Sequence, residues 1–361
     1  MKNQLRINSL ARRLAVACLL LCPPAFCLGA ENAKAEPVRV IFDTDMYTDF
    51  DDAGALACLH ALADAGECEI LATVTCTRDA LSVAMCEIIN GYYGRPDIPV
   101  GCVKGIGHSG MERRHVEIYG ETVKRYARWV RTPNSNDAPD ALDVYRRILA
   151  AQPDGSVVIC SVGFLTNLRK LLESKPDAHS PLDGRALVAR KVRRWVAMAC
   201  RCPKGREYNS GTDAESSRIA LAGWPTPVEV VDFEYGVNCF AGRKLADSGA
   251  KGNPVADVFA ANLPPRSAIR VKPGERPPWR EGVAGHAAWD EVSALRAVRE
   301  AAPYFNVQRG TYRMIGDKGE NDWTPDEANG RHLRLTERLS KVEVGAILDE
   351  LMCRAPKQPK R

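Results

Sequence analysis

The most distinctive chemical feature of this 361-residue sequence is a dense acidic cluster. The stretch "IFDTDMYTDFDDAGAL" contains five aspartates within ten residues, namely Asp43, Asp45, Asp49, Asp51 and Asp52. Carboxylates this close repel one another, and a hard cation with oxygen ligands would neutralise them; Ca²⁺ suits such ligands best and Mg²⁺ less readily. The alternative is an acidic helix N-terminus, where carboxylates accept backbone N–H bonds and meet the positive end of the helix dipole. That alternative accounts for one or two aspartates but not for five, so the cluster favours a metal site.

The surrounding pattern places this cluster at the end of a strand. Apolar runs predict strands over 38–42, 69–76, 156–163, 193–200 and 227–233, and amphipathic runs predict helices over 52–66, 80–94, 138–153 and 165–174. This alternation predicts an α/β fold with a mostly parallel sheet flanked by helices. Such sheets bind ligands at the carboxyl ends of their strands, which is where the acidic loop lies. Two loop-like stretches, 104–136 and 264–285, are expected to be long loops, the first covering the site.

The first thirty residues have the layout of a secretory signal peptide. Four basic residues precede an apolar run, and small residues follow it. The run contains prolines and is shorter than the roughly 20 residues that a membrane span needs. Cleavage after Ala30, or as late as Ala35, would leave a single domain over 37–355. We therefore expect an exported protein, periplasmic or secreted, with no membrane association after cleavage.

Charge and cysteine content exclude some classes of protein. The formal net charge is +5, and four of the positive charges lie in the predicted signal. No basic stripe interleaved with aromatic residues is present, which argues against a nucleic-acid partner. Ten of the thirteen cysteines follow the signal, and several lie in apolar runs, where cysteine packs as a small hydrophobe. We expect mostly buried thiols, because a chain of this length needs no disulfide framework. The sequence leaves open whether one or two disulfide bridges form after export.

Five motifs in order resemble one enzyme family. The acidic motif is followed by "GRPDIPVG" (94–101), "VGFLTNL" (162–168), "REYNSGTDAESS" (206–217) and "WDEVSALRAV" (289–298). Together they resemble the inosine-uridine nucleoside hydrolases, which bind Ca²⁺ and cleave the N-glycosidic bonds of ribonucleosides. The resemblance covers about 37–300 and implies the Rossmann-like nucleoside hydrolase fold. The later part of the chain is similar to an exported bacterial branch of that family.

The resemblance implies a set of metal ligands. Asp45 matches the aspartate that both binds Ca²⁺ and takes a proton from the attacking water. Asp52 and Asp290 match further carboxylate ligands, and Thr166 matches a residue that gives its backbone carbonyl to the metal. These roles fit the chemistry, because a cation beside a water lowers the pKa of that water until a carboxylate suffices as the base.

The resemblance also implies contacts to the sugar. Asp51 matches the carboxylate that holds the ribose hydroxyls. Glu207 and Asn209 match the pair that grips the outer hydroxyl, and Met198 matches a residue packed near the ring. An anionic, oxygen-rich site of this kind stabilises the oxocarbenium character that develops as the base leaves.

Three departures from the family pattern affect this site. Five residues instead of three separate the two halves of the acidic motif, so Asp49 is an extra carboxylate that faces either metal or solvent. The asparagine that many members carry after the second strand is missing, and Arg78 stands nearby as a candidate for binding an anionic group or for pairing with Asp79. Trp289 replaces the histidine that protonates the leaving base in some members. His286 could substitute for that histidine if its loop turns inward, and Trp289 could stack on a base or pack into the core.

The leading hypothesis is calcium-dependent hydrolysis of a ribonucleoside to free base and ribose. Two alternatives stay open, namely the same chemistry on a different ribosyl or glycosyl substrate, and a catalytically weak, calcium-dependent pentose-binding protein. The sequence leaves the nucleobase preference open, and it leaves homo-oligomer formation open as well.

Overall fold

The computed structural model describes residues 36–46, 49–109, 113–268 and 282–357. The predicted signal peptide lies outside these residues, as does most of the predicted loop 264–285. Contacts within the chain group Pro37–Arg361 into one compact unit. Among the described helices, none is both long and apolar enough to cross a membrane.

A ten-stranded sheet forms the centre of this unit, in the order β3-β2-β1-β4-β5-β7-β12-β10-β11-β6. Its parallel part contains β1 (Val38–Thr44), β2 (Cys68–Thr75), β3 (Val100–Cys102), β4 (Val157–Ser161), β5 (Val192–Met198), β7 (Val228–Val231) and β12 (His332–Glu337). Its antiparallel part contains β10 (Phe305–Ile315), β11 (Glu320–Pro325) and β6 (Lys204–Arg206). A separate antiparallel pair joins β8 (Phe240–Gly242) to β9 (Gly285–Ala287). The mostly parallel sheet confirms the predicted fold class.

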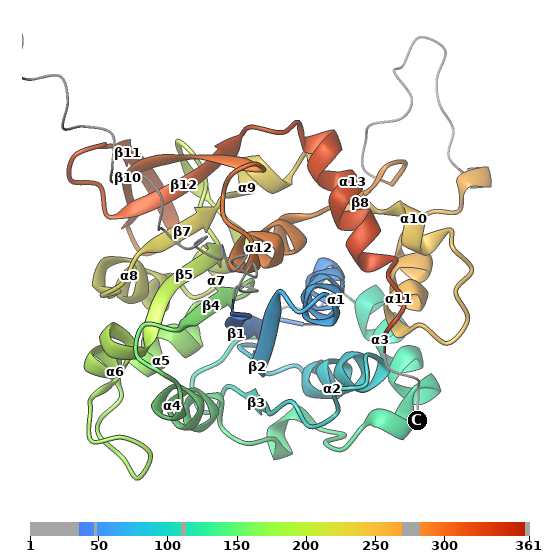
Figure 1. The fold of residues 1–361 in the computed structure, drawn as a ribbon, viewed down its shortest axis with the longest axis horizontal. Coiled ribbons are helices and arrows are strands. Elements are labelled where there is room, and N and C mark those ends of the chain that lie inside the picture. Colours follow the sequence, from blue (N-terminus) through green and yellow to red (C-terminus); the bar gives the residue numbers. More distant parts are fainter. Residues whose placement is uncertain (1–35, 47–48, 110–112, 269–281, 358–361) are drawn as a thin grey trace, which may run out of the picture. The chain divides into compact units, whose positions relative to one another are not determined.

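Helices cover both faces of the sheet (Figure 1). The longer helices are α1 (Asp51–Asp64), α2 (Ser82–Tyr92), α3 (Arg113–Arg125), α4 (Ala141–Ala151), α5 (Thr166–Glu173), α6 (Gly184–Lys191), α8 (Ala214–Gly223), α11 (Pro254–Asn262), α12 (Trp289–Val298) and α13 (Lys341–Met352). The short ones are α7 (Tyr208–Thr212), α9 (Phe233–Gly236), α10 (Arg243–Ala246) and the 3₁₀ turns η1 (Ala127–Trp129), η2 (Ser135–Asp137) and η3 (Arg266–Ala268).

The core is divided by the sheet into two layers. Helices α1, α2, α11, α12 and α13 pack into one hydrophobic cluster, and α4, α5, α6 and α8 pack into the other. Strand β1 contributes to both, because Val40 and Phe42 face the first layer and Ile41 faces the second. Burial on both faces explains why the parallel strands read as continuous apolar runs.

Helix α1 differs from the amphipathic helix that its sequence suggested. Every residue from Asp51 to Leu62 is buried, so the helix is enclosed on all sides. Its small residues allow α12 to pack closely against it: a Cβ on Gly54 would lie 2.2 Å from the Glu291 carboxylate. This close packing brings the N-terminus of α12 to the N-terminus of α1, where the acidic cluster lies.

The stretch 104–136 is not a plain loop. It contains helix α3, followed by the turns η1 and η2. Glu117, Glu121, Lys124 and Arg125 of α3 are exposed, whereas Tyr119 and Thr122 on the same helix are buried. The long stretch is therefore a structured part of the unit.

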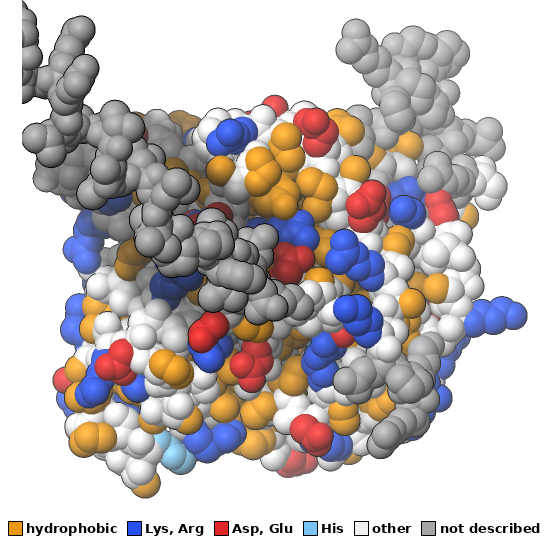
Figure 2. Space-filling view, in the orientation of Figure 1, with side chains coloured by type: hydrophobic (Ala, Val, Ile, Leu, Met, Phe, Trp, Pro, Cys, Tyr) orange, Lys and Arg blue, Asp and Glu red, His pale blue; other side chains and the backbone are white. Residues whose placement is uncertain are grey.

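The surface charge and the state of the cysteines were both predicted from the sequence. On the face shown in Figure 2, basic and acidic side chains are interspersed and form no continuous basic stripe.

The ten cysteines that the structure describes are all free, and eight of them are buried. The expectation of buried thiols holds for these eight.

Candidate active site

The acidic loop leaves the sheet at its topological switch point. β1 lies between β2 and β4, so the chain connections run in opposite directions on its two sides. The Thr44 hydroxyl donates a hydrogen bond to Asp52 Oδ1, and the backbone amide of Met46 donates to Thr44 Oγ1 at 2.9 Å. Thr44 thereby fixes the start of the loop against the first turn of α1.

Three buried carboxylates converge where this loop meets α12. Oxygens of Asp51, Asp52 and Asp290 all lie within 4.8 Å of one another. The backbone amide of Asp290 also donates a hydrogen bond to Asp51 Oδ2 at 3.4 Å. Residues from the first and the last of the motifs that resemble the family thus form one group.

This group carries uncompensated negative charge. Burial, followed by repulsion from Asp45 and Asp49, raises the pKa of Asp52 well above its ordinary value. Burial and repulsion from Asp290 and Asp49 likewise raise the pKa of Asp51. Asp52 Oδ2 is buried and has no hydrogen-bond partner among the described residues. A set of oxygen donors with an orphaned, buried carboxylate oxygen fits a hard divalent cation.

The acidic-cap alternative explains less of this geometry. The N-cap residue of α1 is Phe50, which makes no side-chain cap. Asp51 and Asp52 do occupy the first turn, where the helix dipole favours them. The Asp52 carboxylate, however, accepts from Thr44 and faces Asp290 rather than capping α1.

A cavity of about 280 Å³ opens beside the carboxylate group. Eight of its lining residues were predicted from the sequence: Asp45, Asp49, Asp51, Met198, Glu207, Asn209, Trp289 and Asp290. The other four lining residues were not: His115, Val162, Tyr208 and Phe233. The cavity therefore has acidic groups on one side and aromatic groups on another.

Glu207 and Asn209 are held rigidly in the cavity wall. Glu207 is the N-cap of α7, and its carboxylate accepts backbone N–H bonds from Asn209 at 2.7 Å and Ser210 at 2.8 Å. Burial nevertheless raises the pKa of Glu207. Asn209 Nδ2 donates to the Val162 carbonyl at 2.9 Å, which leaves Oδ1 as the amide atom that no described hydrogen bond uses. Both residues are buried, so they are not solvated surface residues.

Gly163, in the turn after β4, packs directly on Asp45. A Cβ on Gly163 would lie 2.4 Å from the Asp45 backbone nitrogen and 2.8 Å from its Oδ1. Three residues later, the Thr166 hydroxyl donates to Asp213 Oδ2 at 2.5 Å. The Thr166 side chain is therefore already used, which agrees with a role for its backbone alone.

Asp43, at the end of β1, fixes the start of the acidic loop through hydrogen bonds. Tyr145 donates to Asp43 Oδ2 at 2.7 Å, and Asn167 Nδ2 donates to Oδ1 at 3.2 Å. Burial raises the pKa of Asp43 to about 7 despite these bonds. Asp43 does not line the cavity.

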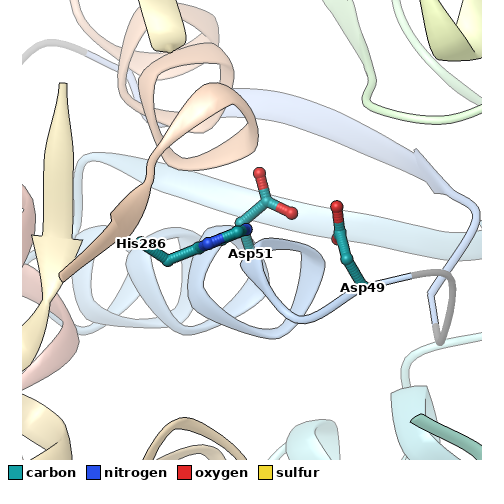
Figure 3. A group of neighbouring side chains, drawn as sticks. All are labelled: Asp49, Asp51 and His286. Carbon is teal, nitrogen blue, oxygen red and sulfur yellow. The ribbon is translucent and has the colours of Figure 1, made fainter. Parts of the chain in front are cut away.

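Trp289 and His286 lie next to each other, with ring centroids 5.9 Å apart, but they have different partners. The Trp289 indole donates to the Phe233 carbonyl at 3.0 Å, and its ring lies 5.3 Å from the Phe233 ring, so it forms an aromatic wall. His286 comes from β9, stacks on Phe50 and lies with Asp49 and Asp51 in a second group whose ligand atoms are within 4.8 Å (Figure 3). His286 is thus turned toward the acidic loop and is not among the cavity-lining residues.

Arg78 is not among the residues that line the cavity. Its side chain is exposed and packs over Gly107, and no ion pair joins it to Asp79 among the described residues. Asp79 instead accepts a hydrogen bond from the Thr77 hydroxyl at 2.6 Å. Gly107, over which the Arg78 side chain packs, does not line the cavity either.

Comparison with known proteins agrees with this geometry. The sequence model of the inosine-uridine preferring nucleoside hydrolases matches residues 40–299. The chain belongs to this family. No curated protein sequence matches the chain significantly.

Solved structures of nucleoside hydrolases share the fold of this family member. The inosine-uridine preferring nucleoside hydrolase of Bacillus anthracis has a TM-score of 0.63 at 13% identity, covering 89% of this chain and 99% of the other. The purine-preferring ribonucleoside hydrolase of Gardnerella vaginalis has a TM-score of 0.62 at 16% identity, covering 87% and 96%. The type III effector XopQ, solved with adenosine diphosphate ribose, has a TM-score of 0.60 at 16% identity, covering 90% and 94%. At these identities the likeness concerns the fold.

Proposed function

We propose that this nucleoside hydrolase family member cleaves the N-glycosidic bond of a ribonucleoside in a Ca²⁺-dependent reaction. The observation that carries the proposal is the convergence of Asp51, Asp52 and Asp290 beside a cavity that Asp45, Glu207 and Asn209 also line. Acidic groups that could bind a cation and groups that could bind a sugar thus share one enclosed space.

Four groups of the chain would hold the ion, namely the carboxylates of Asp45, Asp52 and Asp290 and the backbone carbonyl of Thr166. Oxygen donors alone favour Ca²⁺ over softer metals. When bound, the ion supplies a lowered pKa for an adjacent water.

The remaining groups bind and position the sugar. Asp45 takes a proton from the attacking water, while Asp51, Glu207 and Asn209 accept or donate hydrogen bonds to ribose hydroxyls. Glu207 and Asn209 are held by backbone hydrogen bonds, so they need no rearrangement when the sugar binds. Met198 packs beside Asn209 and closes this wall. The negative field stabilises the positive charge that develops at C1′ as the bond breaks.

The aromatic side of the cavity suits the nucleobase. Trp289 and Phe233 present flat apolar surface on the cavity wall, and Tyr208 adds a third ring. A base stacked there would leave its sugar facing the carboxylates.

Turnover of a panel of ribonucleosides tests the proposal. The purified protein with Ca²⁺ should release base from at least one nucleoside, and Asp45→Asn should lower kcat by about 100-fold or more, because the base for the attacking water is lost. Asp97→Asn, a change at an exposed aspartate, should retain full activity. No turnover of any nucleoside with Ca²⁺ present would overturn the proposal.

A second candidate is a ribosyl-binding protein with little catalysis, or an enzyme for another ribosyl compound. It is favoured by XopQ, a protein of the same fold that was solved with adenosine diphosphate ribose. Calorimetric titration with ribose and with adenosine diphosphate ribose, alongside the turnover assay, separates the two candidates. Binding without hydrolysis of any nucleoside would favour the second.

We also propose export of the protein, on the basis of the N-terminal sequence pattern alone. N-terminal sequencing of the protein isolated from its producing cell tests this. A mature chain that begins between residues 31 and 36 agrees with the proposal, and a chain that retains Met1 contradicts it.

A further inference from the structure

Helix α3 presents one buried stripe toward the rest of the protein. Tyr119 and Thr122 on α3, and Tyr126 directly after the helix, follow one another at spacings of three and four residues, and all three are buried. His115 lies four residues before Tyr119, so it is on the same side of the helix, one turn nearer the N-terminus. There the stripe leaves the core and reaches the cavity, which His115 lines.

The position of this helix is fixed at two points. The Tyr119 hydroxyl donates to the backbone carbonyl of Asp49 at 2.5 Å, which ties α3 to the acidic loop. At the other end, the Tyr126 hydroxyl and Arg125 both donate to the Asp257 carboxylate of α11, at 2.6 and 2.8 Å. His115 is therefore held in a defined place relative to the carboxylate group.

Cleavage of an N-glycosidic bond requires a proton for the leaving base, because an unprotonated purine or pyrimidine anion is a poor leaving group. Among the groups that line the cavity, Glu207 is engaged by backbone hydrogen bonds, and the aspartates surround the proposed cation. Burial raises the pKa of Tyr208 to about 12, which makes its hydroxyl a weak acid. Histidine is the side chain best suited to donate a proton near neutral pH.

We propose that His115 protonates the departing nucleobase. The inference rests on the proposed function and concerns the same cavity. As the bond between C1′ and the base nitrogen breaks, its electron pair stays on the base, and a base nitrogen takes the proton of the His115 imidazolium. The hydroxyl of the attacking water bonds to C1′, and its proton passes to Asp45. Exchange with solvent then returns a proton to His115 and removes one from Asp45, so the products are free base and ribose.

Two substrates with different leaving groups test this role. A nucleoside needs protonation of its base, whereas 4-nitrophenyl ribofuranoside releases a stable phenolate without a proton donor. His115→Gln should lower kcat/KM for the nucleoside by about 100-fold or more and change kcat/KM for the nitrophenyl riboside by less than about 5-fold. Asp45→Asn should lose both activities. Glu121→Gln, an exposed change on the same helix, should lose neither.

Each other outcome overturns the inference. Equal loss of both activities in His115→Gln would show a structural role, and thermal unfolding of that variant would reveal it. Retention of both activities would exclude His115 as the donor. Selective loss in Tyr208→Phe or His286→Ala, without selective loss in His115→Gln, would assign the proton to another residue. Wild-type protein that turns over a ribonucleoside, with His115→Gln equally active on both substrates, would overturn the inference alone, whereas wild-type protein that turns over no ribonucleoside would overturn the proposed function itself.

Discussion

Asp52 has one carboxylate oxygen that no hydrogen bond uses among the described residues, and it lies among other buried acids. Replacing it with asparagine removes one of these repelling charges while keeping an oxygen that can accept from Thr44. We expect Asp52→Asn to raise the free energy of unfolding of the metal-free protein, because burial and the neighbouring carboxylates oppose a charge at this position. The same change removes a proposed Ca²⁺ ligand, so the stabilisation by added Ca²⁺ should be smaller than in the wild type.

Thermal unfolding with a chelator and with excess Ca²⁺ measures both effects. In the wild type, Ca²⁺ at 100 times its dissociation constant should add about 2.7 kcal/mol to the free energy of unfolding. The exposed Asp97→Asn change serves as the control and should behave as the wild type does. A metal-free Asp52→Asn protein that is less stable than the wild type would contradict the view that repulsion dominates this group.

His60 is a buried histidine whose protonation opposes folding. Its Nε2 lies 2.9 Å from Asn90 Oδ1, and its ring stacks on Tyr93. Burial, and then the positive charge of Arg95, lowers the pKa of His60 to about 3. Between about pH 6.5 and pH 3 the unfolded chain therefore binds a proton at this residue that the folded protein does not bind. Stability from this group is lost as the pH falls through that window.

Unfolding in denaturant at several pH values tests this. In His60→Gln the free energy of unfolding should fall less steeply between pH 6 and pH 4 than in the wild type, by up to about 1.4 kcal/mol per pH unit. His179→Gln removes a histidine that pairs with the exposed Asp143 and serves as the control. Parallel pH profiles for the wild type and His60→Gln would rule out a shifted pKa at His60.

At the scale of elements, the turn after β4 packs against Asp45, the proposed catalytic base, at the end of β1. Alanine at Gly163 would place a methyl group 2.4 Å from the Asp45 backbone nitrogen, so one of the two segments must move. A displacement of about 1 Å at a reacting group can lower a rate by about 100-fold. We expect Gly163→Ala to lower kcat by that order and to weaken Ca²⁺ binding.

Steady-state kinetics and metal titration measure these effects. Gly120→Ala on α3 is the matched control, because nothing lies within 4 Å of the added methyl group there. That variant should be fully active and at least as stable as the wild type, since alanine favours a helix more than glycine does. Full activity in Gly163→Ala would show that the turn can yield without moving Asp45.

The elements were partly predictable from the sequence. The continuous apolar runs of β1 and β4 predicted buried strands of a parallel sheet. The ends of both strands in the structure lie within two residues of the predicted ends. Helix α3 was hidden because its charged outward side dominates its composition and only Tyr119 and Thr122 mark its buried stripe. The enclosure of α1 was equally hidden, since small residues do not reveal whether a second helix packs on them.

At the scale of the whole molecule, the described cysteines are free thiols, most of them packed in the core, and they form no disulfide framework. All ten described cysteines are free, and only Cys202 and Cys353 are less than fully buried. Burial raises the pKa of Cys58, Cys76 and Cys160 well above the ordinary value, so these thiols should be inert in the folded protein.

Titration with a thiol reagent tests this arrangement. At most two thiols of the mature chain should react quickly in the native state, and all ten should react after denaturation without reductant. Dithiothreitol should leave the unfolding temperature unchanged. Fewer than ten reactive thiols in the denatured, unreduced protein would reveal a disulfide.

The site as a whole was predicted better than its surroundings. The acidic motif and the matching segments around Asn209 and Asp290 named seven of the residues that line the cavity, and Met198 is the eighth. Their catalytic and binding roles stay predictions. His115 and Phe233 were missed because each reaches the cavity through the packing of its own helix, which no local motif encodes. The antiparallel strands β10 and β11 were also missed, since they lie outside the segments that resemble the family.

The hydrogen bond from the Asp290 amide to Asp51 joins residues that are 239 positions apart in the sequence. The carboxylate group can therefore form only after the segment from β1 to α12 has been brought together. Contacts of such long range are made late in folding, because the entropy of closing so large a loop must be overcome first. A cation bound there would stabilise the folded protein but not the transition state for folding. It would therefore slow unfolding and leave the rate of folding almost unchanged.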